Sequence, residues 1–155
     1  MLNEQKHQEL LNKSILIINK DISLKRRMQE ICELLHKEGK HYDWVGFYMK
    51  NGNKDELKLG PFVGAPTDHK IIPFGSGICG RVAIEERTIN VDDVRKEDNY
   101  IACSLSTRSE LVVPIMKDGK FLGQIDVDSD KESAFSIRDE RLLQSIARRL
   151  AEELD

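Results

Sequence analysis

Two cysteines and three acidic residues fall within one continuous stretch of the chain, at positions that could support chemistry. Cys79 lies in a glycine-rich segment and Cys103 in a polar one, while Glu110 opens an apolar run and Asp126 and Asp128 close another. A thiolate is a nucleophile that can be oxidised and reduced again, and crowded carboxyls either hold protons or bind cations. These residue types together predict redox chemistry on a small cationic or zwitterionic molecule.

The segment around Cys79, residues 75–80 (GSGICG), matches the G-x-G-x-x-G pattern of dinucleotide sites. The helix predicted after it, at about 78–86, is short for a parallel crossover, and the later strands pair as a hairpin, so a nucleotide site is disfavoured. The glycines also suit a tight corner between a strand and a helix. Cys79 would then lie in the first helical turn, where backbone N–H groups favour a thiolate, although an inert buried cysteine fits the same pattern.

The other two cysteines have different surroundings. Cys103 lies in an irregular segment beside serines, and because loops on a rigid scaffold often carry reactive groups, we favour a reactive role over packing. Cys32 lies on the apolar face of a predicted helix that ends at Gly39, and we predict that it is a core residue. His36 and His41 lie nearby, but a metal site is disfavoured because no second ligand pair has the spacing of a zinc site.

The acidic residues near the end of the second apolar run alternate with apolar ones. Asp126 and Asp128 are two positions apart on a predicted strand, so they point to one face, and Ile125 and Val127 point to the other. Two carboxylates on one face repel each other, which favours either a retained proton or a cationic ligand. A solvated strand end without a function is the simpler alternative.

Glu110 is harder to place on the same face. A two-residue turn at 118–119 would set Glu110 opposite Val127, which points away from the two aspartates. A β-bulge, for example at Gly123, or a longer loop would move Glu110 onto the carboxylate face.

These residues need a scaffold, and the rest of the chain supplies one. Apolar periodicity predicts helices within residues 1–38 and over 137–154, the latter starting with a capping box at Ser136 and Asp139. The region 40–130 would hold the sheet and the pocket, and aromatic residues such as Trp44 and Tyr48 would form core or pocket wall. The predicted strands are 42–49, 56–59, 70–73, 88–91, 109–116 and 120–127. This pattern predicts one α+β domain over 1–155, with helices at both ends of a mostly antiparallel sheet.

The composition of the chain limits the classes of partner that it is expected to bind. The chain has 24 basic and 27 acidic residues, a balance that gives no electrostatic footprint for nucleic acid or an anionic membrane. It shows neither a secretory signal nor an apolar stretch of about 18 residues, so we expect a cytoplasmic protein. Three cysteines at irregular spacing predict reduced thiols and not a structural disulfide framework.

Six segments in order resemble the free methionine-(R)-sulfoxide reductases, which are single GAF domains. They are 44–48 (WVGFY), 59–62 (LGPF), 72–80 (IPFGSGICG), 98–103 (DNYIAC), 109–114 (SELVVP) and 122–129 (LGQIDVDS). The resemblance implies a GAF-like fold, in which a six-stranded antiparallel sheet has helices packed on one face and a ligand pocket on the other. It also implies a homodimer.

The resemblance assigns roles to the two thiols. Cys103 would be the catalytic nucleophile that attacks free methionine sulfoxide and becomes a sulfenic acid, and Cys79 would resolve it to a disulfide that a thioredoxin-type reductant reopens. No cofactor or metal is implied. The family often has a further cysteine just before the glycine corner, where this chain reads 67–70 (TDHK), so the resolving step falls to Cys79 or an external thiol.

The resemblance also assigns the substrate contacts. Glu110, Asp126 and Asp128 would bind the ammonium and stabilise or protonate the sulfoxide oxygen, and Trp44 and Tyr48 would wall the methyl-sulfinyl group. A GAF sensor that binds a small ligand without turnover is the alternative, because the fold hosts both functions. Sensors usually adjoin an output domain, and the chain has no room for one, which favours the enzyme.

Overall fold

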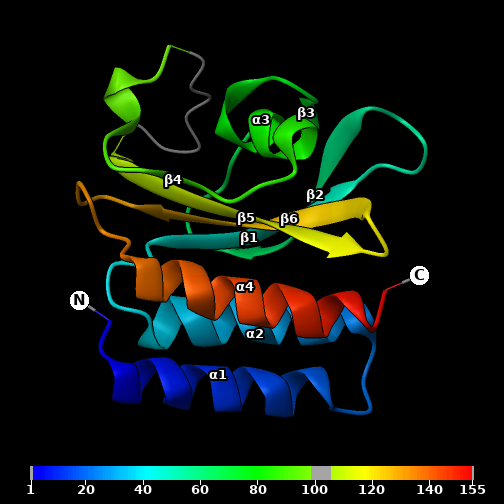
Figure 1. Cartoon of the computed structure of the whole chain (residues 1–155), viewed down its shortest axis with the longest axis vertical. Helices are drawn as coiled ribbons and strands as arrows, with labels where there is room; N and C mark the ends of the chain where they lie inside the picture. Colours follow the sequence, from blue (N-terminus) through cyan, green and yellow to red (C-terminus); the bar gives the residue numbers. More distant parts are fainter. Residues whose placement is uncertain (1, 99–105, 155) are drawn as a thin grey trace.

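The protein is built on a six-stranded antiparallel sheet (Figure 1). The computed structural model describes residues 2–98 and 106–154. In space the strands follow the order β3-β2-β1-β6-β5-β4, and each described neighbouring pair is antiparallel. The strands are β1 (Trp44–Lys50), β2 (Glu56–Val63), β3 (Ile71–Pro73), β4 (Ile89–Val91), β5 (Ser109–Lys117) and β6 (Lys120–Ser129). The predicted GAF-like α+β architecture is confirmed.

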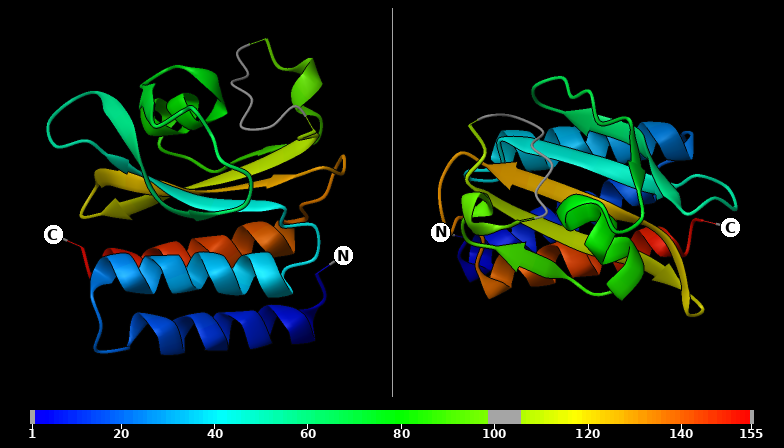
Figure 2. Two further views of the ribbon diagram at one scale, coloured as in Figure 1. Left: turned by 180° about the vertical axis from the view of Figure 1, so that it is seen from behind. Right: turned by 90° about the horizontal axis from the view of Figure 1, so that it is seen from above.

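Helices cover the two faces of the sheet unequally. α2 (Leu24–Glu38) and α4 (Ile137–Ala151) lie side by side against one face, and α1 (Glu4–Ile18) packs on them as an outer layer (Figures 1 and 2). The opposite face carries α3 (Gly77–Glu85), which sits above β5 and β6. None of the helices in the described ranges is both long and apolar enough to cross a membrane.

Local sequence signals set the helix starts. The Ser23 hydroxyl accepts a hydrogen bond from the Arg26 amide at 3.1 Å and caps α2. The capping box predicted for α4 is present, since the Ser136 amide donates to the Asp139 carboxylate at 2.8 Å. Because both caps use side chains close in sequence, these boundaries follow from sequence alone.

The main core lies between the sheet and the helices. Strand residues such as Ile125 and Val127 point into it and are fully buried, as the alternation along β6 predicts. Cys32 on α2 is also fully buried there, which confirms it as a core residue. The largest fully buried side chains of this core are Phe47, Leu10, Ile31, Leu35, Leu111, Ile115, Ile125, Leu142, Leu143 and Ile146.

The β5–β6 hairpin fixes which side chains share a face. Its turn residues Asp118 and Gly119 both have positive φ, 52° and 77°, as a two-residue hairpin turn requires. Ile115 pairs with Gly123, but the next residue, Met116, pairs with Phe121. One residue of β6, Leu122, is therefore extra, and the predicted bulge near Gly123 is confirmed.

The bulge brings the acidic residues together. With the extra residue in β6, Glu110 pairs with Asp128 and not with Val127. Glu110 thus joins Asp126 and Asp128 on the face that α3 covers, whereas Val127 stays in the helical core.

Two segments differ from the predicted secondary structure. β2 continues to Val63, beyond its predicted end at residue 59, and its pairing with β1 has a register shift between Gly46 and Tyr48. Between the predicted strands 88–91 and 109–116 the chain forms a short 3₁₀ helix, Val94–Lys96, whose first turn is capped by the Asp93 carboxylate.

Candidate active site

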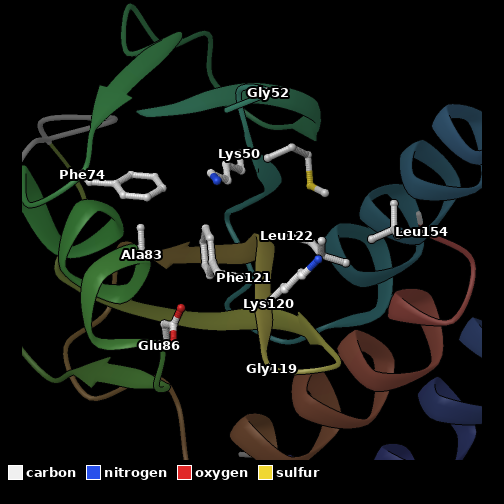
Figure 3. A pocket seen from close by; sticks show the side chains of 11 residues that line it. Lys50, Gly52, Phe74, Ala83, Glu86, Gly119, Lys120, Phe121, Leu122 and Leu154 are labelled. Atoms are coloured by element: carbon white, nitrogen blue, oxygen red, sulfur yellow. The ribbon is translucent and has the colours of Figure 1, made fainter. Parts of the chain in front are cut away.

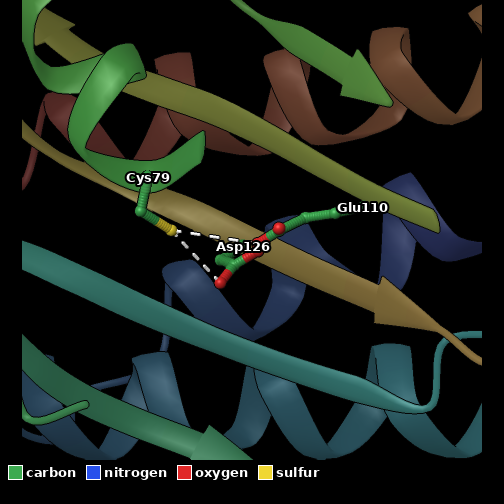
Figure 4. Close-up of side chains that lie close together, drawn as sticks. All are labelled: Cys79, Glu110 and Asp126. Atoms are coloured by element: carbon green, nitrogen blue, oxygen red, sulfur yellow. Dashed lines mark hydrogen bonds between the residues drawn. The ribbon is translucent and has the colours of Figure 1, made fainter. Parts of the chain in front are cut away.

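A thiol and two carboxylates meet in the layer between α3 and the sheet (Figure 4). The Cys79 sulfur lies 3.3 Å from Oδ2 of Asp126 and 3.9 Å from Oε2 of Glu110. All three side chains are buried, with Asp126 fully inaccessible to solvent. The site therefore joins a helix residue to residues from two central strands, β5 and β6.

The glycine corner positions Cys79. Cys79 is the third residue of α3, within its first turn, as predicted. Gly80 allows the helix to approach the preceding strand closely, since a Cβ there would lie 2.8 Å from the Pro73 carbonyl oxygen. The Gln124 amide donates to the Cys79 carbonyl at 3.2 Å and ties α3 to β6. Because β3 pairs antiparallel with β2, the glycine motif lacks the parallel βαβ setting of a dinucleotide site.

The surroundings of Asp126 change the pKa of its carboxyl. Burial raises the pKa of its carboxyl above the ordinary value, and hydrogen bonds with Glu110, Cys79 and Asp128 offset part of that rise. No salt bridge to Asp126 is present among residues 2–98 and 106–154. A carboxyl in this setting retains its proton to higher pH than an exposed aspartate, so it can serve as a proton donor beside the thiol.

Asp128 extends the acidic face along β6. It is nearly fully buried and pairs with Glu110 on one side and Trp44 on the other. The three residues thus form one row across β5, β6 and β1. The prediction that Asp126 and Asp128 share a face is confirmed, and their burial excludes a solvated strand end.

Aromatic side chains border the acids on the β1 side. Trp44 stacks on Tyr48 with ring centroids 6.2 Å apart, and on Phe62 at 5.5 Å. The Trp44 indole N–H donates to the Ala65 carbonyl at 3.0 Å, and the Tyr48 hydroxyl donates to the His69 carbonyl at 2.8 Å. These contacts hold the 64–70 loop over the same face of the sheet, so Trp44 and Tyr48 are well placed as a pocket wall.

The cavity beside the thiol is narrow. Its volume is about 10 Å³, comparable to the space for a single water molecule. Its lining residues come from the 64–70 loop, β3, the start of α3 and β5: His69, Ile72, Ser76, Gly77, Ile78, Cys79 and Glu110. A ligand the size of an amino acid therefore requires movement of these segments.

A wider groove of about 510 Å³ lies elsewhere, by the hairpin turns of β1–β2 and β5–β6 (Figure 3). Lys50 and Lys120 line it together with Phe74 and Phe121. Among the described residues that line it, none is a predicted site residue and none carries a thiol. We therefore place the candidate active site at the smaller cavity, where the titratable groups converge.

The residues that the sequence singled out divide into four groups. Cys79, Glu110 and Asp126 meet directly, and Asp128, Trp44 and Tyr48 share their face of the sheet. Cys103 lies outside the described residues. Cys32 is in the helical core, where its thiol contacts the Pro61 carbonyl at 3.6 Å and burial raises its pKa. Among the residues in the described ranges, neither Cys32 nor the nearby histidines form a metal-ligand cluster.

Sequence reasoning missed Gln124, which anchors α3 beside the acids. The signal was available, because Gln124 continues the alternation of Asp126 and Asp128 on one strand face. A buried polar residue at that phase indicates a partner on the opposite layer.

Comparison with known proteins gives matches over most of the chain. Residues 23–154 match the GAF domain family. The chain is 32% identical to the free methionine-R-sulfoxide reductase of Escherichia coli over 78% of its own length and 72% of that protein. The structure of the free methionine-R-sulfoxide reductase from Neisseria meningitidis in complex with its substrate superposes with a TM-score of 0.91, at 30% identity, covering 98% of this chain and 91% of that one.

A protein that is named for a different role is also similar. The structure of a putative GAF sensor protein from Burkholderia vietnamiensis superposes with a TM-score of 0.87 at 30% identity, covering 94% of this chain and 91% of that one. Sensors and reductases thus share this fold, and the chemistry of the site has to separate them.

Proposed function

We propose that this chain uses Cys103 as its nucleophile and the buried acids as its proton donor and ammonium-binding group. The chain belongs to the GAF domain family and within it to the free methionine-R-sulfoxide reductases. The protein is an oxidoreductase that converts free methionine-R-sulfoxide to methionine. The observation that supports these roles best is the contact of the Cys79 thiol with the Asp126 and Glu110 carboxyls.

In the first step the Cys103 thiolate attacks the sulfoxide sulfur, and a cluster carboxyl protonates the sulfoxide oxygen. Asp126 is the proposed donor because burial raises its pKa, so it holds its proton to higher pH than an exposed aspartate. The sulfur–oxygen bond of the substrate breaks, and the oxygen ends as a sulfenic acid on Cys103. The substrate sulfur gains two electrons and the cysteine sulfur loses two, so methionine leaves as the reduced product.

In the second step the Cys79 thiol condenses with the sulfenic acid, forming a disulfide and releasing water. A dithiol reductant of the thioredoxin type then reopens the disulfide by thiol exchange and is itself oxidised. The start of α3 suits Cys79 to this role, because its backbone is anchored at Gln124 while its thiol borders the narrow cavity.

The substrate ammonium would be recognised by the two remaining acids, Glu110 and Asp128. Glu110 and Asp128 lie opposite each other on β5 and β6, so an ammonium between them would neutralise two buried acids at once. Trp44 and Tyr48 would contact the methyl-sulfinyl group from the β1 side. This arrangement selects the free amino acid, because a peptide bond at the nitrogen removes the positive charge.

The setting of the reaction follows from the same proposal. Because the thiols must be reduced between turnovers, we place the protein in the cytoplasm with a thioredoxin-type partner. We also propose a homodimer, which light scattering on the purified protein would test.

A sensor that binds a ligand without turnover is the competing function among GAF domains. Such a sensor needs no thiol in contact with a proton-retaining carboxyl, and burying both without a chemical role would be costly. The thiol–carboxyl contact therefore favours the reductase.

The test measures methionine formed from free R- and S-methionine sulfoxide by the purified protein, first with a dithiol reductant and then without one. Cys103→Ser should form no methionine, whereas Cys79→Ser should form about one per chain and then stall without an external thiol. Cys32→Ser is the matched control and should match the wild type. Repeated turnover by Cys103→Ser would exclude Cys103 as the nucleophile.

A further inference from the structure

The Cys79 sulfur and the nearest oxygens of Glu110 and Asp126 have the spacing of a metal site. These three atoms lie within 4.8 Å of one another. In a tetrahedral zinc site, with bonds of about 2.3 Å to sulfur and about 2.1 Å to oxygen, neighbouring sulfur and oxygen ligands are about 3.6 Å apart. The measured sulfur–oxygen distances of 3.3 and 3.9 Å lie on either side of that value.

A second observation points to a missing ligand at the same place. Oδ1 of Asp126 has no hydrogen-bond partner among the described residues, and neither has Oε1 of Gln124, although both side chains are fully buried. Gln124 contacts the backbone of Cys79 through its amide nitrogen, so its oxygen lies beside the cluster. Buried oxygens without a donor are unfavourable, and a cation bound to the Asp126 carboxylate would relieve the first of them.

We propose that a thiophilic divalent cation, Zn²⁺ or its analogue Cd²⁺, binds Cys79, Glu110 and Asp126 and reversibly inhibits the protein. Binding displaces the thiol proton of Cys79 and the proton of Asp126, because metal ligands must be deprotonated. One thiolate with two carboxylates suits these ions and disfavours Mg²⁺ and Ca²⁺, which take only oxygen ligands. The ion acts as an inhibitor and not as a cofactor.

The narrow cavity provides the fourth position. It borders both Cys79 and Glu110, and its volume of about 10 Å³ accommodates one water molecule. A tetrahedral ion with three protein ligands and one water is the arrangement of an accessible zinc site. The same cavity is the route by which the ion reaches the thiol.

Inhibition rests on the proposed function, whereas metal binding does not. A bound ion occupies the acids that would hold the substrate ammonium and the thiol that would resolve the sulfenic acid. Zinc would therefore block both substrate binding and regeneration, and a chelator would restore activity.

The test titrates Cd²⁺ alone into the fully reduced, metal-free protein and follows the ultraviolet thiolate-to-cadmium charge-transfer band. The intensity of this band should saturate when the wild type has bound one ion per chain. Cys79→Ser should lose the band. Asp126→Asn should weaken binding by roughly 100-fold, at least as much as loss of a residue that only orients a metal ligand. Circular dichroism of each variant establishes that it is folded.

Two matched variants separate this site from the other cysteines. Cys32→Ser should bind as the wild type does, because Cys32 is remote in the helical core. Cys103→Ser, which the proposed function makes inactive, should also keep the band. Loss of the band in Cys103→Ser, or its retention in Cys79→Ser, would overturn the metal site.

An activity measurement completes the test. Zn²⁺ should inhibit wild-type turnover in proportion to occupancy, with Mg²⁺ as the control that has no effect, and a chelator should reverse the inhibition. Normal turnover with no metal binding would overturn this proposal and leave the reductase function intact. Metal binding without any reductase activity in the wild type would instead contradict the proposed function alone.

Discussion

The two faces of the sheet bury different kinds of side chain. On β6, Ile125 and Val127 enter the helical core, which is almost wholly apolar. The alternate residues Gln124, Asp126 and Asp128 enter the α3 side, where acids are buried among aromatic and aliphatic groups. Alternate residues of β6 thus pack in the helical core, and the residues between them face the candidate active site. The difference shows that burial alone does not tell a structural position from a functional one.

The helical side does contain one buried acid, and its environment is different. Asp139 accepts a hydrogen bond from the Tyr42 hydroxyl at 2.5 Å and another from the Ser136 amide at 2.8 Å. Burial and the neighbouring Asp139 raise the pKa of Tyr42, so this hydroxyl stays protonated and keeps donating. Asp139 is saturated with donors, whereas Asp126 has an oxygen without one among the described residues. A saturated acid stabilises a fold, and an unsaturated acid is available to a ligand.

The largest effect is expected on the helical side. Leu143→Ala removes a fully buried side chain from the α4 packing surface and should lower the free energy of unfolding by about 2–5 kcal/mol. The kcat/KM of the folded fraction should stay close to the wild-type value. Chemical denaturation and steady-state assays at low temperature measure the two quantities. A large loss of activity in fully folded protein would show that the two faces are coupled.

On the α3 side, Asp126→Asn should reverse this pattern and lower kcat/KM by roughly a hundredfold, through loss of the proposed proton donor, at the low end of what general acid catalysis contributes. At neutral pH the free energy of unfolding of this variant should be higher than that of the wild type. The folded-state pKa of Asp126 is raised above 3.8, so the folded wild type binds more protons than the unfolded chain and loses stability as pH rises from 3.8 through the raised value. Asparagine does not titrate and escapes that loss.

Thermal unfolding of wild type and Asp126→Asn at several pH values measures this difference. The stability advantage of the variant should grow between about pH 4 and neutral pH. Asp130→Asn, an exposed position just beyond the same strand, is the matched control and should show little change. An advantage that shrinks with rising pH would mean that Asp126 is buried in its charged form.

A change in the substrate tests the same face without altering the fold. N-acetyl methionine sulfoxide lacks the ammonium, so its kcat/KM should fall roughly ten- to a hundredfold below that of the free amino acid, before any steric exclusion. Competition between the two compounds in one assay gives the ratio directly. Equal rates would show that the acids do not bind the ammonium.

The smallest effect is expected for Tyr42→Phe. The change removes one of the hydrogen bonds to Asp139 while the Ser136 contacts remain, so stability should fall by about 1 kcal/mol. Reductase activity should be unaffected. Urea denaturation with an unchanged slope would attribute the loss to the folded state. A loss well above that size would show that the capping box depends on Tyr42.

Local features of the fold could be predicted from sequence, because nearby residues determine them. The capping box at Ser136 and the turn at Asp118–Gly119 follow from side-chain chemistry and positive-φ preference. The shared face of Asp126 and Asp128 follows from strand alternation. Within the described residues, these predictions agree with the structure.

Contacts between distant segments could not be predicted in the same way. The approach of the Cys79 thiol to Asp126 depends on how α3 packs over β5 and β6, which no local pattern determines. The sequence equally allowed a solvated end for β6, and only the covering layer decides that Asp126 is buried and retains its proton. The extension of β2 through Gly60–Pro61 likewise goes with a register shift in its pairing with β1, where these two residues face the single residue Phe47.

The bulge at Leu122 implies that this hairpin tolerates substitutions far better than changes of length. Deleting the codon for Leu122 itself would leave Glu110 opposite Asp128. Deleting one codon between Glu110 and Ile115 would also leave the composition of both strands nearly intact, yet with the turn and the bulge unchanged it would set Glu110 opposite Val127. Either an acid would then enter the helical core or the two strands would separate. Among descendants of this gene, we therefore expect many amino-acid replacements in this hairpin but almost no insertions or deletions between Glu110 and Asp128, except loss of the bulged residue Leu122.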